Sequence, residues 1–314
     1  MMKKISIILA KPRGFCAGVT RAINTVEKSL EKFGPPVYVR HEIVHNKFVV
    51  DALKKKGAIF VNEISQIPPG SVTIFSAHGV SDQVELDAAD KNLDIIDATC
   101  PLVSKVHREA KKYEEQDFEI ILIGHKGHPE VEGTSGRVKK DVILITNEED
   151  ARNVIIKNPQ KLSYVTQTTL SVDDTKKIVD ILEERFPALQ RGLATKDICY
   201  ATQNRQDAVK SLVKMVDMLL VIGAKNSSNS NRLRDLGEES GLDSYLINSA
   251  SDINLQWFDN VETIGLTAGA SAPEILVKEV IEFIANLFNN NIEVSDMDGI
   301  SESTFFALPK KVRK

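Results

Sequence analysis

The sequence predicts an α/β fold made of three small units with parallel sheets, related by a pseudo-threefold arrangement around a central cavity. Three observations predict it. Apolar strand-like runs alternate with amphipathic helical segments along the 314 residues, as in parallel sheets covered by helices. All three cysteines lie where a strand-like run passes into a helical one. Polar turns follow each cysteine at similar distances, so the chain repeats coarsely about every 90–100 residues.

The cysteine turns share one local pattern. Cys16 lies between the apolar run 5–9 and a segment with helical periodicity from Val19 onward. Cys100 follows the run 95–97 and precedes a second helical segment, and Cys199 follows a short apolar stretch and precedes a third. A thiolate is stabilised electrostatically at a helix N-terminus. The pattern therefore predicts three equivalent turns around which the chain is built.

Two polar turns follow each cysteine, each after a predicted strand. Ligands of open parallel sheets bind at the carboxyl ends of the strands, so these turns predict a shared binding cavity. The earlier turns of the three repeats are residues 41–46, 124–130 and 223–231, and the later ones are 76–81, 166–169 and 267–271.

The repeat also predicts the domain organisation. A solvated tail is the interpretation of the last segment, because it ends in the basic residues 310–314. The predicted segments are a first α/β unit at 1–98 with Cys16, His45 and His78, a second at 99–198 with Cys100, His128, Glu130 and Thr168, a third at 199–288 with Cys199, Ser227, Asn229 and Ser271, and a C-terminal tail at 289–314.

Composition excludes several classes of function. A formal net charge of −4 gives no field that would attract nucleic acid or an anionic membrane. The longest apolar run, 218–222, is far shorter than the roughly 20 residues of a membrane span. The N-terminus is interpreted as a first strand rather than a signal peptide. Three widely spaced cysteines do not make a disulfide framework, which favours a reducing, cytoplasmic compartment.

The cysteines leave three interpretations open. Single buried thiols commonly serve as small apolar side chains. Three thiolates that converge form a soft site for zinc with a fourth ligand, or for an iron–sulfur cluster. In a cubane cluster, three cysteines leave one iron without a protein ligand and open to a substrate. Three matching turns and no other cysteine favour a shared site over three separate core thiols.

Residues 41–45 read H-E-I-V-H, the pattern of zinc proteases. That chemistry requires both histidines on one face of a helix. Here the pattern continues the strand-like run 37–39 and contains two β-branched residues, so the sequence predicts an extended segment. A helix is predicted only after Asn46, acting as its N-cap. The protease interpretation is therefore disfavoured.

The polar turns favour an anion pocket. His45, His78 and His128 occupy comparable positions after strands, and residues 226–231 offer hydroxyl and amide groups before a helix, where phosphate binds well. Neither nucleotide-binding glycine motif is present. A diphosphate held by neutral donors and histidines fits this set. Glu130 lies beside His128, where a carboxylate is costly unless it transfers protons; the alternative is a capping carboxylate.

Taken together, these motifs resemble the 4-hydroxy-3-methylbut-2-enyl diphosphate reductase family over almost the whole chain. The resemblance rests on residues 15–19, 44–46, 76–80, 97–101, 127–133, 166–171, 199–202 with 204–206, 226–230 and 269–274.

The resemblance implies a three-lobed fold around one 4Fe–4S cluster held by Cys16, Cys100 and Cys199, with one open iron. It implies reductive removal of the allylic hydroxyl, giving isopentenyl and dimethylallyl diphosphate as the last step of the methylerythritol phosphate route. A ferredoxin or flavodoxin is the expected electron donor. It also implies that Glu130 and Thr168 lie near the substrate hydroxyl, that Glu130 delivers protons, and that Gln167 supports these two residues. The residues implied to hold the diphosphate are His45, His78, His128, Ser227, Ser228, Asn229 and Ser271.

Overall fold

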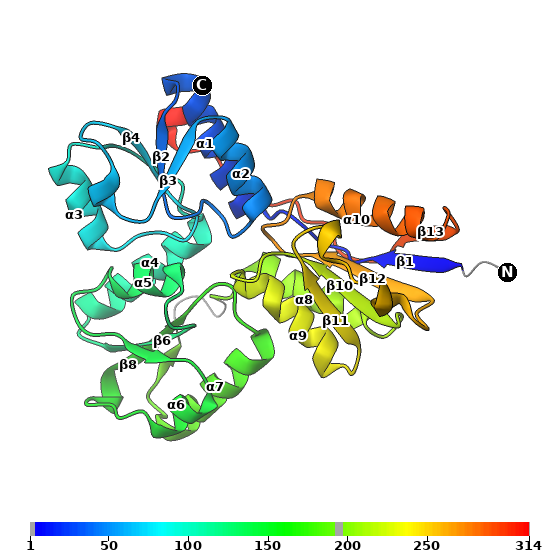
Figure 1. The fold of residues 1–314 in the computed structure, drawn as a ribbon. Helices are drawn as coiled ribbons and strands as arrows, with labels where there is room; N and C mark the ends of the chain where they lie inside the picture. The colour runs from blue at the N-terminus through cyan, green and yellow to red at the C-terminus, as the bar shows by residue number, and fades with distance from the viewer. Residues whose placement is uncertain (1–3, 192–196, 314) are drawn as a thin grey trace. The chain divides into compact units, whose positions relative to one another are not determined.

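The computed structural model describes residues 4–191 and 197–313, and the chain divides into two compact units. Unit 1 comprises Met1–Val19, His45–Val49 and Tyr200–Phe305, and unit 2 comprises Thr20–Val44, Val50–Cys199 and Phe306–Lys314. All strand pairs described are parallel and form three sheets, which confirms the predicted α/β class (Figure 1).

Sheet A, in unit 1, has the strand order β11-β10-β12-β1-β13. All five residues of β10 are buried, because helix α10 packs on one face of the sheet and helices α8 and α9 on the other (Figure 1). Its elements are β1 (Ile5–Leu9), α8 (Tyr200–Leu212), β10 (Met218–Ile222), α9 (Ser228–Glu239), β11 (Asp243–Ile247), η3 (Ala250–Asp252), η4 (Leu255–Phe258), β12 (Thr263–Ala268), α10 (Glu274–Leu287) and β13 (Ile292–Asp296).

Sheet B, in unit 2, has the order β3-β2-β4-β5. One apolar cluster joins Phe75 of β4 to Ala88 of α3 and Ile64 of η1. The elements of this part of the chain are α1 (Ala17–Phe33), β2 (Val37–Arg40), α2 (Lys47–Lys55), β3 (Ala58–Val61), η1 (Ile64–Gln66), β4 (Val72–Phe75), α3 (Asp82–Asp90), β5 (Asp94–Asp97) and, at the C-terminus, η5 (Lys310–Val312).

Sheet C, also in unit 2, has the order β7-β6-β8-β9. Side chains of β6 alternate between a cluster with α7 and a cluster with α4, so both faces are covered. The elements are α4 (Pro101–Glu115), β6 (Glu119–Ile123), α5 (Pro129–Ser135), β7 (Ile143–Ile145), α6 (Glu148–Asn153), η2 (Pro159–Lys161), β8 (Leu162–Thr166), α7 (Val172–Arg185) and β9 (Gln190–Arg191).

One strand order recurs in the three sheets. The strand that leads toward a cysteine is β1, β5 or β9, and in each sheet it pairs with the strand that precedes the later polar turn, β12, β4 or β8. In sheets B and C the cysteine strand comes from the same third of the sequence as its neighbours. In sheet A, however, the N-terminal β1 closes a sheet whose other strands come from residues 218–296.

The two ends of the chain therefore both contribute a strand to sheet A, β1 and β13. The expected first unit, 1–98, contributes its first strand to sheet A rather than to sheet B. Beyond residue 289, β13 pairs with β1 along five residues, and Val312 is 4% exposed. The end of the chain is thus joined to the fold through β13 and Val312, while most of its side chains, including Lys310 and Lys311, are exposed. Among the described residues, no helix combines the length and apolar character needed to cross a bilayer.

Candidate active site

Each cysteine turn is tied to a later polar turn by the same backbone hydrogen bond. The amide of Cys100 donates to the carbonyl of Ala77 at 3.0 Å, and the amide of Cys199 donates to the carbonyl of Thr168 at 3.0 Å, both in unit 2. In unit 1, the amide of Cys16 donates to the carbonyl of Ala270 at 3.2 Å. The pairing of neighbouring parallel strands aligns their carboxyl ends, which brings each cysteine beside a polar turn.

Glu130 and Thr168 are in direct contact in unit 2. Both side chains are 5% exposed, and the amide and hydroxyl of Thr168 each lie 2.9 Å from Oε2 of Glu130. Glu130 sits in the first turn of α5, where the helix dipole stabilises a negative charge. The two hydrogen bonds to one oxygen also fix the orientation of the carboxyl group. The pair predicted from the sequence is therefore brought together in an orientation suited to proton transfer.

Two of the predicted histidines lie beside this pair. His128 is the N-cap of α5, and its Nδ1 accepts a hydrogen bond from the amide of Glu130 at 3.1 Å, so the neutral ring carries its proton on Nε2. The rings of His78 and His128 meet edge to face, with centroids 5.9 Å apart. Nδ1 of His78 lies 3.3 Å from the hydroxyl of Ser76. The Nε2–H of His128 is therefore a suitable hydrogen-bond donor for an anion.

The remaining predicted ligands gather in unit 1. The hydroxyl of Ser271 donates to the carbonyl of His45 at 3.0 Å, and Nδ1 of His45 lies 3.3 Å from Nδ2 of Asn226. Ser227 is the N-cap of α9, so Ser228 and Asn229 belong to the first helical turn rather than to a loop. Oδ1 of Asn229 accepts from the amide of Ala270 at 2.9 Å.

Asn229 carries a buried donor that is available to a ligand. The residue is 3% exposed, and its Nδ2 is buried without a hydrogen-bond partner among the described residues. A buried amide nitrogen without a partner costs free energy, about 1–3 kcal/mol in general. It lies at the N-terminus of a 12-residue helix, which attracts anions. This end of α9 is therefore a good position for one part of an anionic ligand.

The structure thus assembles two partial groups, one in each unit. Unit 2 holds His78, Cys100, His128, Glu130, Thr168 and Cys199, and unit 1 holds Cys16, His45, Ser227, Ser228, Asn229 and Ser271. All three cysteines are partly exposed and are not in disulfides. Within the described ranges, no group of three or more Cys, His, Asp or Glu side chains is arranged to hold a metal.

The H-E-I-V-H segment is not helical, as the sequence predicted. His41 has a left-handed φ of 59°, and α2 begins only at Lys47. The amide of Val49 donates to Oδ1 of Asn46 at 3.1 Å, which confirms Asn46 as the N-cap. The two histidines therefore do not share a helix face as protease chemistry requires.

Asp197 and Glu109 are two interacting acidic side chains that the sequence did not single out. Burial, together with the charge of Glu109, raises the pKa of Asp197 to about 7, against the opposing effect of the hydrogen bond from the amide of Thr166. Oδ1 of Asp197 and Oε1 of Glu109 are both buried without a partner among the described residues. An aspartate shortly before both Cys100 and Cys199 was a signal available in the sequence. Nothing in the sequence singles out Glu109.

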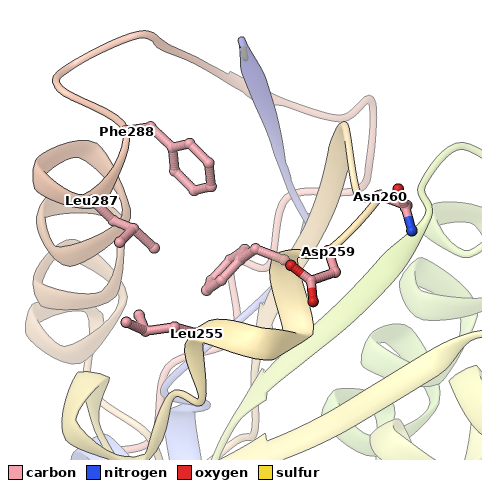
Figure 2. Close-up of a pocket in the computed structure, with 6 residues that line it drawn as sticks. Leu255, Asp259, Asn260, Leu287 and Phe288 are labelled. Atoms are coloured by element: carbon pink, nitrogen blue, oxygen red, sulfur yellow. The ribbon is translucent and has the colours of Figure 1, made fainter. Parts of the chain in front are cut away.

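A cavity lined by none of the predicted site residues lies elsewhere in unit 1. It has a volume of about 500 Å³ and lies between η4, the end of α10 and the turn that leads into β12 (Figure 2). It is lined by apolar and polar groups, and the rings of Phe258 and Phe288 meet edge to face at 5.6 Å. Asn260 precedes β12, so the cavity is at the amino ends of the strands, opposite the polar turns. It is not part of the candidate site. The lining residues are Leu255, Phe258, Asp259, Asn260, Leu287 and Phe288.

The fold and these groups define an α/β protein with polar, thiol-bearing turns at the carboxyl edges of parallel sheets, a position used by many enzymes of anionic substrates. The chain belongs to the LytB protein family, whose family model matches residues 7–285.

Relatives over the full length carry one name. The chain is 53% identical over 313 residues to 4-hydroxy-3-methylbut-2-enyl diphosphate reductase of Francisella philomiragia, covering 99% of this chain and 98% of that protein. It is 54% identical over 314 residues to the enzyme of the same name from Acinetobacter baylyi, covering 98% of each.

Two solved structures of reductases are similar as well. The E-1-hydroxy-2-methyl-but-2-enyl-4-diphosphate reductase of Plasmodium falciparum superposes with a TM-score of 0.93 at 39% identity, covering 99% of this chain and 97% of that one. A second structure, of (E)-4-hydroxy-3-methyl-but-2-enyl diphosphate reductase, gives a TM-score of 0.64 at 32% identity, covering 90% of this chain and 99% of that one. It is described as the terminal enzyme of the non-mevalonate pathway.

Proposed function

We propose that the protein is a reductase that converts 4-hydroxy-3-methylbut-2-enyl diphosphate to isopentenyl and dimethylallyl diphosphate, the last step of the methylerythritol phosphate route. Relatives that share more than half of its residues over the full length carry this name. The observation that carries the proposal is the buried Glu130–Thr168 pair, which adjoins the Cys199 turn through the carbonyl of Thr168.

We propose that Cys16, Cys100 and Cys199 hold one 4Fe–4S cluster with one iron left open. Thiolates are the ligands that such clusters use. The three residues are thiols, each is partly exposed, and each is fixed by the same amide-to-carbonyl bond. When bound, the cluster would supply electrons one at a time and a Lewis-acidic iron. A ferredoxin or flavodoxin is the proposed electron donor, and the cytoplasm is the proposed compartment.

The proposed role of the histidines and of the α9 turn is to bind the substrate diphosphate. The donors are neutral: the Nε2–H of His128, the buried Nδ2 of Asn229, and hydroxyls of the serines. The N-terminus of α9 adds the favourable end of a helix dipole. The residues proposed to hold the diphosphate are His45, His78, His128, Ser227, Ser228, Asn229 and Ser271.

Glu130 is the proposed proton donor for the leaving hydroxyl. Removing that hydroxyl as water takes two electrons and two protons, and the new C–H bond forms at either end of the allyl unit. Thr168 orients Oε2 of Glu130 through two hydrogen bonds. Gln167 fixes the neighbouring turn, because its Oε1 accepts from the amide of His125 and its Nε2 donates to the hydroxyl of Thr169. A closed site would keep water from competing for these protons.

The three-unit organisation with boundaries at residues 98 and 198 is part of the same proposal, with the difference that β1 and β13 belong to sheet A. It is supported by the strand order that sheets A, B and C share.

Anaerobic reconstitution with iron and sulfide tests the function directly. We expect about four iron and four sulfide per chain, and formation of both products from the diphosphate substrate with a chemical reductant. Cys100→Ser should lose most of the bound iron. One zinc per chain with no acid-labile sulfide would instead indicate a non-catalytic zinc module, and a fully loaded, active Cys100→Ser variant would contradict the cluster assignment.

A further inference from the structure

Arg205 is the only arginine among the largest fully buried side chains of the chain's described part, with an exposure of 0%. A buried guanidinium needs a counter-charge and hydrogen-bond acceptors, because it leaves water with its charge intact. Arg205 lies in α8, the helix that begins one residue after Cys199. It belongs to unit 1 together with the Cys16 turn.

Glu302 supplies the counter-charge. Its carboxylate pairs with both terminal nitrogens of Arg205, at 3.0 Å and 3.3 Å from Nη1 and 3.2 Å from Nη2. The carboxylate is 14% exposed and also accepts from Nδ2 of Asn204 at 2.9 Å. The pair is therefore a nearly buried, fork-shaped ion pair, the geometry in which arginine cannot be replaced by lysine without loss.

Nη1 of Arg205 also donates to the carbonyl of Ala201 within α8, at 2.9 Å, and the other donors are directed at the backbone of the Cys16 turn. Nε and Nη2 lie 3.1 Å and 2.7 Å from the carbonyl of Gly14, two residues before Cys16. Gly14 has a φ of +68°, a conformation suited to glycine, and its amide donates to the carbonyl of Ala268. The backbone amide and carbonyl of Gly14 are thus both hydrogen-bonded, and Arg205 holds the carbonyl.

The segment that carries Glu302 runs along the same turn. The amide of Met297 donates to the carbonyl of Leu9 at 3.0 Å, and Gly299 packs so closely on Lys11 that a Cβ there would lie 2.1 Å from the carbonyl oxygen. Thr304 hydrogen-bonds to the hydroxyl of Tyr200, which also accepts from the amide of Ala17. Residues 297–304 therefore contact the turn from Leu9 to Ala17 at several points.

We propose that Arg205 and Glu302 are positioning residues for Cys16: the C-terminal segment, through this ion pair, fixes the Gly14 carbonyl and hence the place of the thiol. That Cys16 is a cluster ligand rests on the proposed function, but the positioning of its thiol by Arg205 and Glu302 does not. Neither residue touches the reacting atoms. Loss of either partner leaves a buried charge unpaired and releases the turn from the C-terminal segment.

The test is the alkylation rate of Cys16 by iodoacetamide in the full-length chain without iron, read by mass spectrometry relative to Cys100 in the same molecule. We expect Glu302→Gln and Arg205→Lys to increase this ratio about tenfold, because local opening of the turn becomes more frequent. In the iron-loaded protein, the same variants should release iron to a chelator several times faster than the wild type.

The matched control is Glu239→Gln. It removes the partner of Arg232, another arginine of unit 1 that is only 7% exposed, whose ion pair lies in α9. It should lower the melting temperature without changing the Cys16 ratio. If Arg205→Lys does not fold, Asn204→Ala, which removes one donor to Glu302, gives a milder test. An unchanged ratio in Glu302→Gln overturns the proposal. A chain that takes up no iron but shows the increased ratio would contradict the proposed function alone.

Discussion

The amide and the hydroxyl of Thr168 donate to the same carboxylate oxygen of Glu130, each at 2.9 Å. A carboxyl group held in this way keeps one orientation, with Oε2 as the acceptor of both hydrogen bonds. The second oxygen is then the one that we propose to exchange protons with the substrate. The threonine backbone also holds Cys199 through its carbonyl, so one residue links the acid and a thiol.

Glu130→Gln should lower kcat by about 100-fold or more, because the amide keeps an acceptor for Thr168 but cannot deliver a proton. KM should change by less than about threefold, because the diphosphate contacts remain. Steady-state kinetics with a chemical reductant measure both. Glu132→Gln, on the exposed side of the same short helix, is the matched control and should keep full turnover. Normal turnover in Glu130→Gln would remove this residue from the mechanism.

Much of this site could be predicted from the sequence because its signals are local. Asn46 as an N-cap, Ser227 before α9 and the polar turns after apolar strands are each encoded within a few residues. Parallel pairing then aligns the carboxyl ends of neighbouring strands, so placing these turns at sheet edges required no long-range information.

The rest of the fold and of the site could not be predicted in this way, because it depends on contacts between distant segments. Nothing in the run at 5–9 indicates that β1 pairs with β12 and β13 rather than with the strands that follow it. Similarly, Arg205 and Glu302 are 97 residues apart, and neither has a local motif. The partners of a charged residue are set by the fold, so the sequence alone gave no reason to single out this pair.

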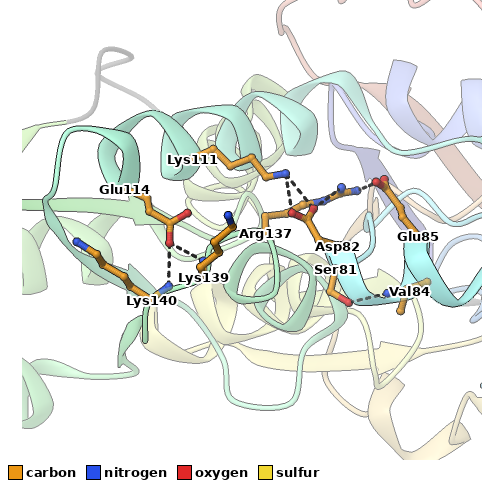
Figure 3. A network of polar contacts seen from close by, with 9 residues as sticks. All are labelled: Ser81, Asp82, Val84, Glu85, Lys111, Glu114, Arg137, Lys139 and Lys140. Atoms are coloured by element: carbon orange, nitrogen blue, oxygen red, sulfur yellow. Dashed lines mark hydrogen bonds and ion pairs between the residues drawn. The ribbon is translucent and has the colours of Figure 1, made fainter.

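Asp82 anchors an ion-pair network that joins helices of sheets B and C within unit 2. Its carboxylate accepts from Lys111 of α4 at 2.8 Å and from Arg137, just after α5, at 2.9 Å, and Arg137 also pairs with Glu85 at 2.6 Å (Figure 3). Partial burial raises the pKa of the Asp82 carboxyl, but the hydrogen bonds from Lys111 and Arg137 outweigh it. They hold the pKa of Asp82 below its ordinary value.

Asp82→Asn should therefore lower the free energy of unfolding by about 1 kcal/mol, since the network is partly exposed. The loss should shrink at 1 M salt, where charges are screened within about 3 Å. Urea titrations at low and high salt measure it. Asp180→Asn, which removes an exposed i,i+4 pair with Lys176 in α7, should cost less than about 0.5 kcal/mol. Equal losses in both variants would show that the network adds nothing to isolated pairs.

His107 should make stability depend on pH. It is 6% exposed, and burial, aided by the positive charge of Arg137, lowers its pKa from 6.5 to about 4. Between these values the unfolded chain binds a proton that the folded chain does not. The free energy of unfolding therefore falls as the pH decreases through this window, by about 3 kcal/mol in total, and is unaffected by this group at higher pH.

Urea titrations of the wild type and of His107→Gln at pH 7 and pH 5 check this. The wild type should lose about 2 kcal/mol more than the variant over this interval. The carboxylates titrate in both proteins, so their contribution to the free energy of unfolding cancels when the two losses are compared. Parallel loss of stability in the two proteins would mean that the imidazole is protonated in the folded chain.

Gly79 follows His78, and the imidazole ring of His107 limits which side chain can fit at this position. Its φ is +79°, and a Cβ would lie 2.5 Å from Cε1 of His107 and 3.2 Å from Cγ2 of Thr99. Gly79→Ala should therefore lower the free energy of unfolding by more than about 2 kcal/mol, combining an unfavourable φ with a steric clash. The control is Gly70→Ala, with a similar φ of +75° and open space around the Cβ position among the described residues, which should cost only about 1 kcal/mol.

A double variant separates the two causes. Because His107→Ala removes the clashing ring, adding Gly79→Ala to it should cost about as little as Gly70→Ala costs in the wild type, roughly 1 kcal/mol. Urea titrations of the single and double variants give this coupling energy. If Gly79→Ala costs the same in both backgrounds, the ring is not what constrains this position. The constraint would then come from Thr99 and the backbone alone, and His107 would have no part in fixing the turn that carries His78.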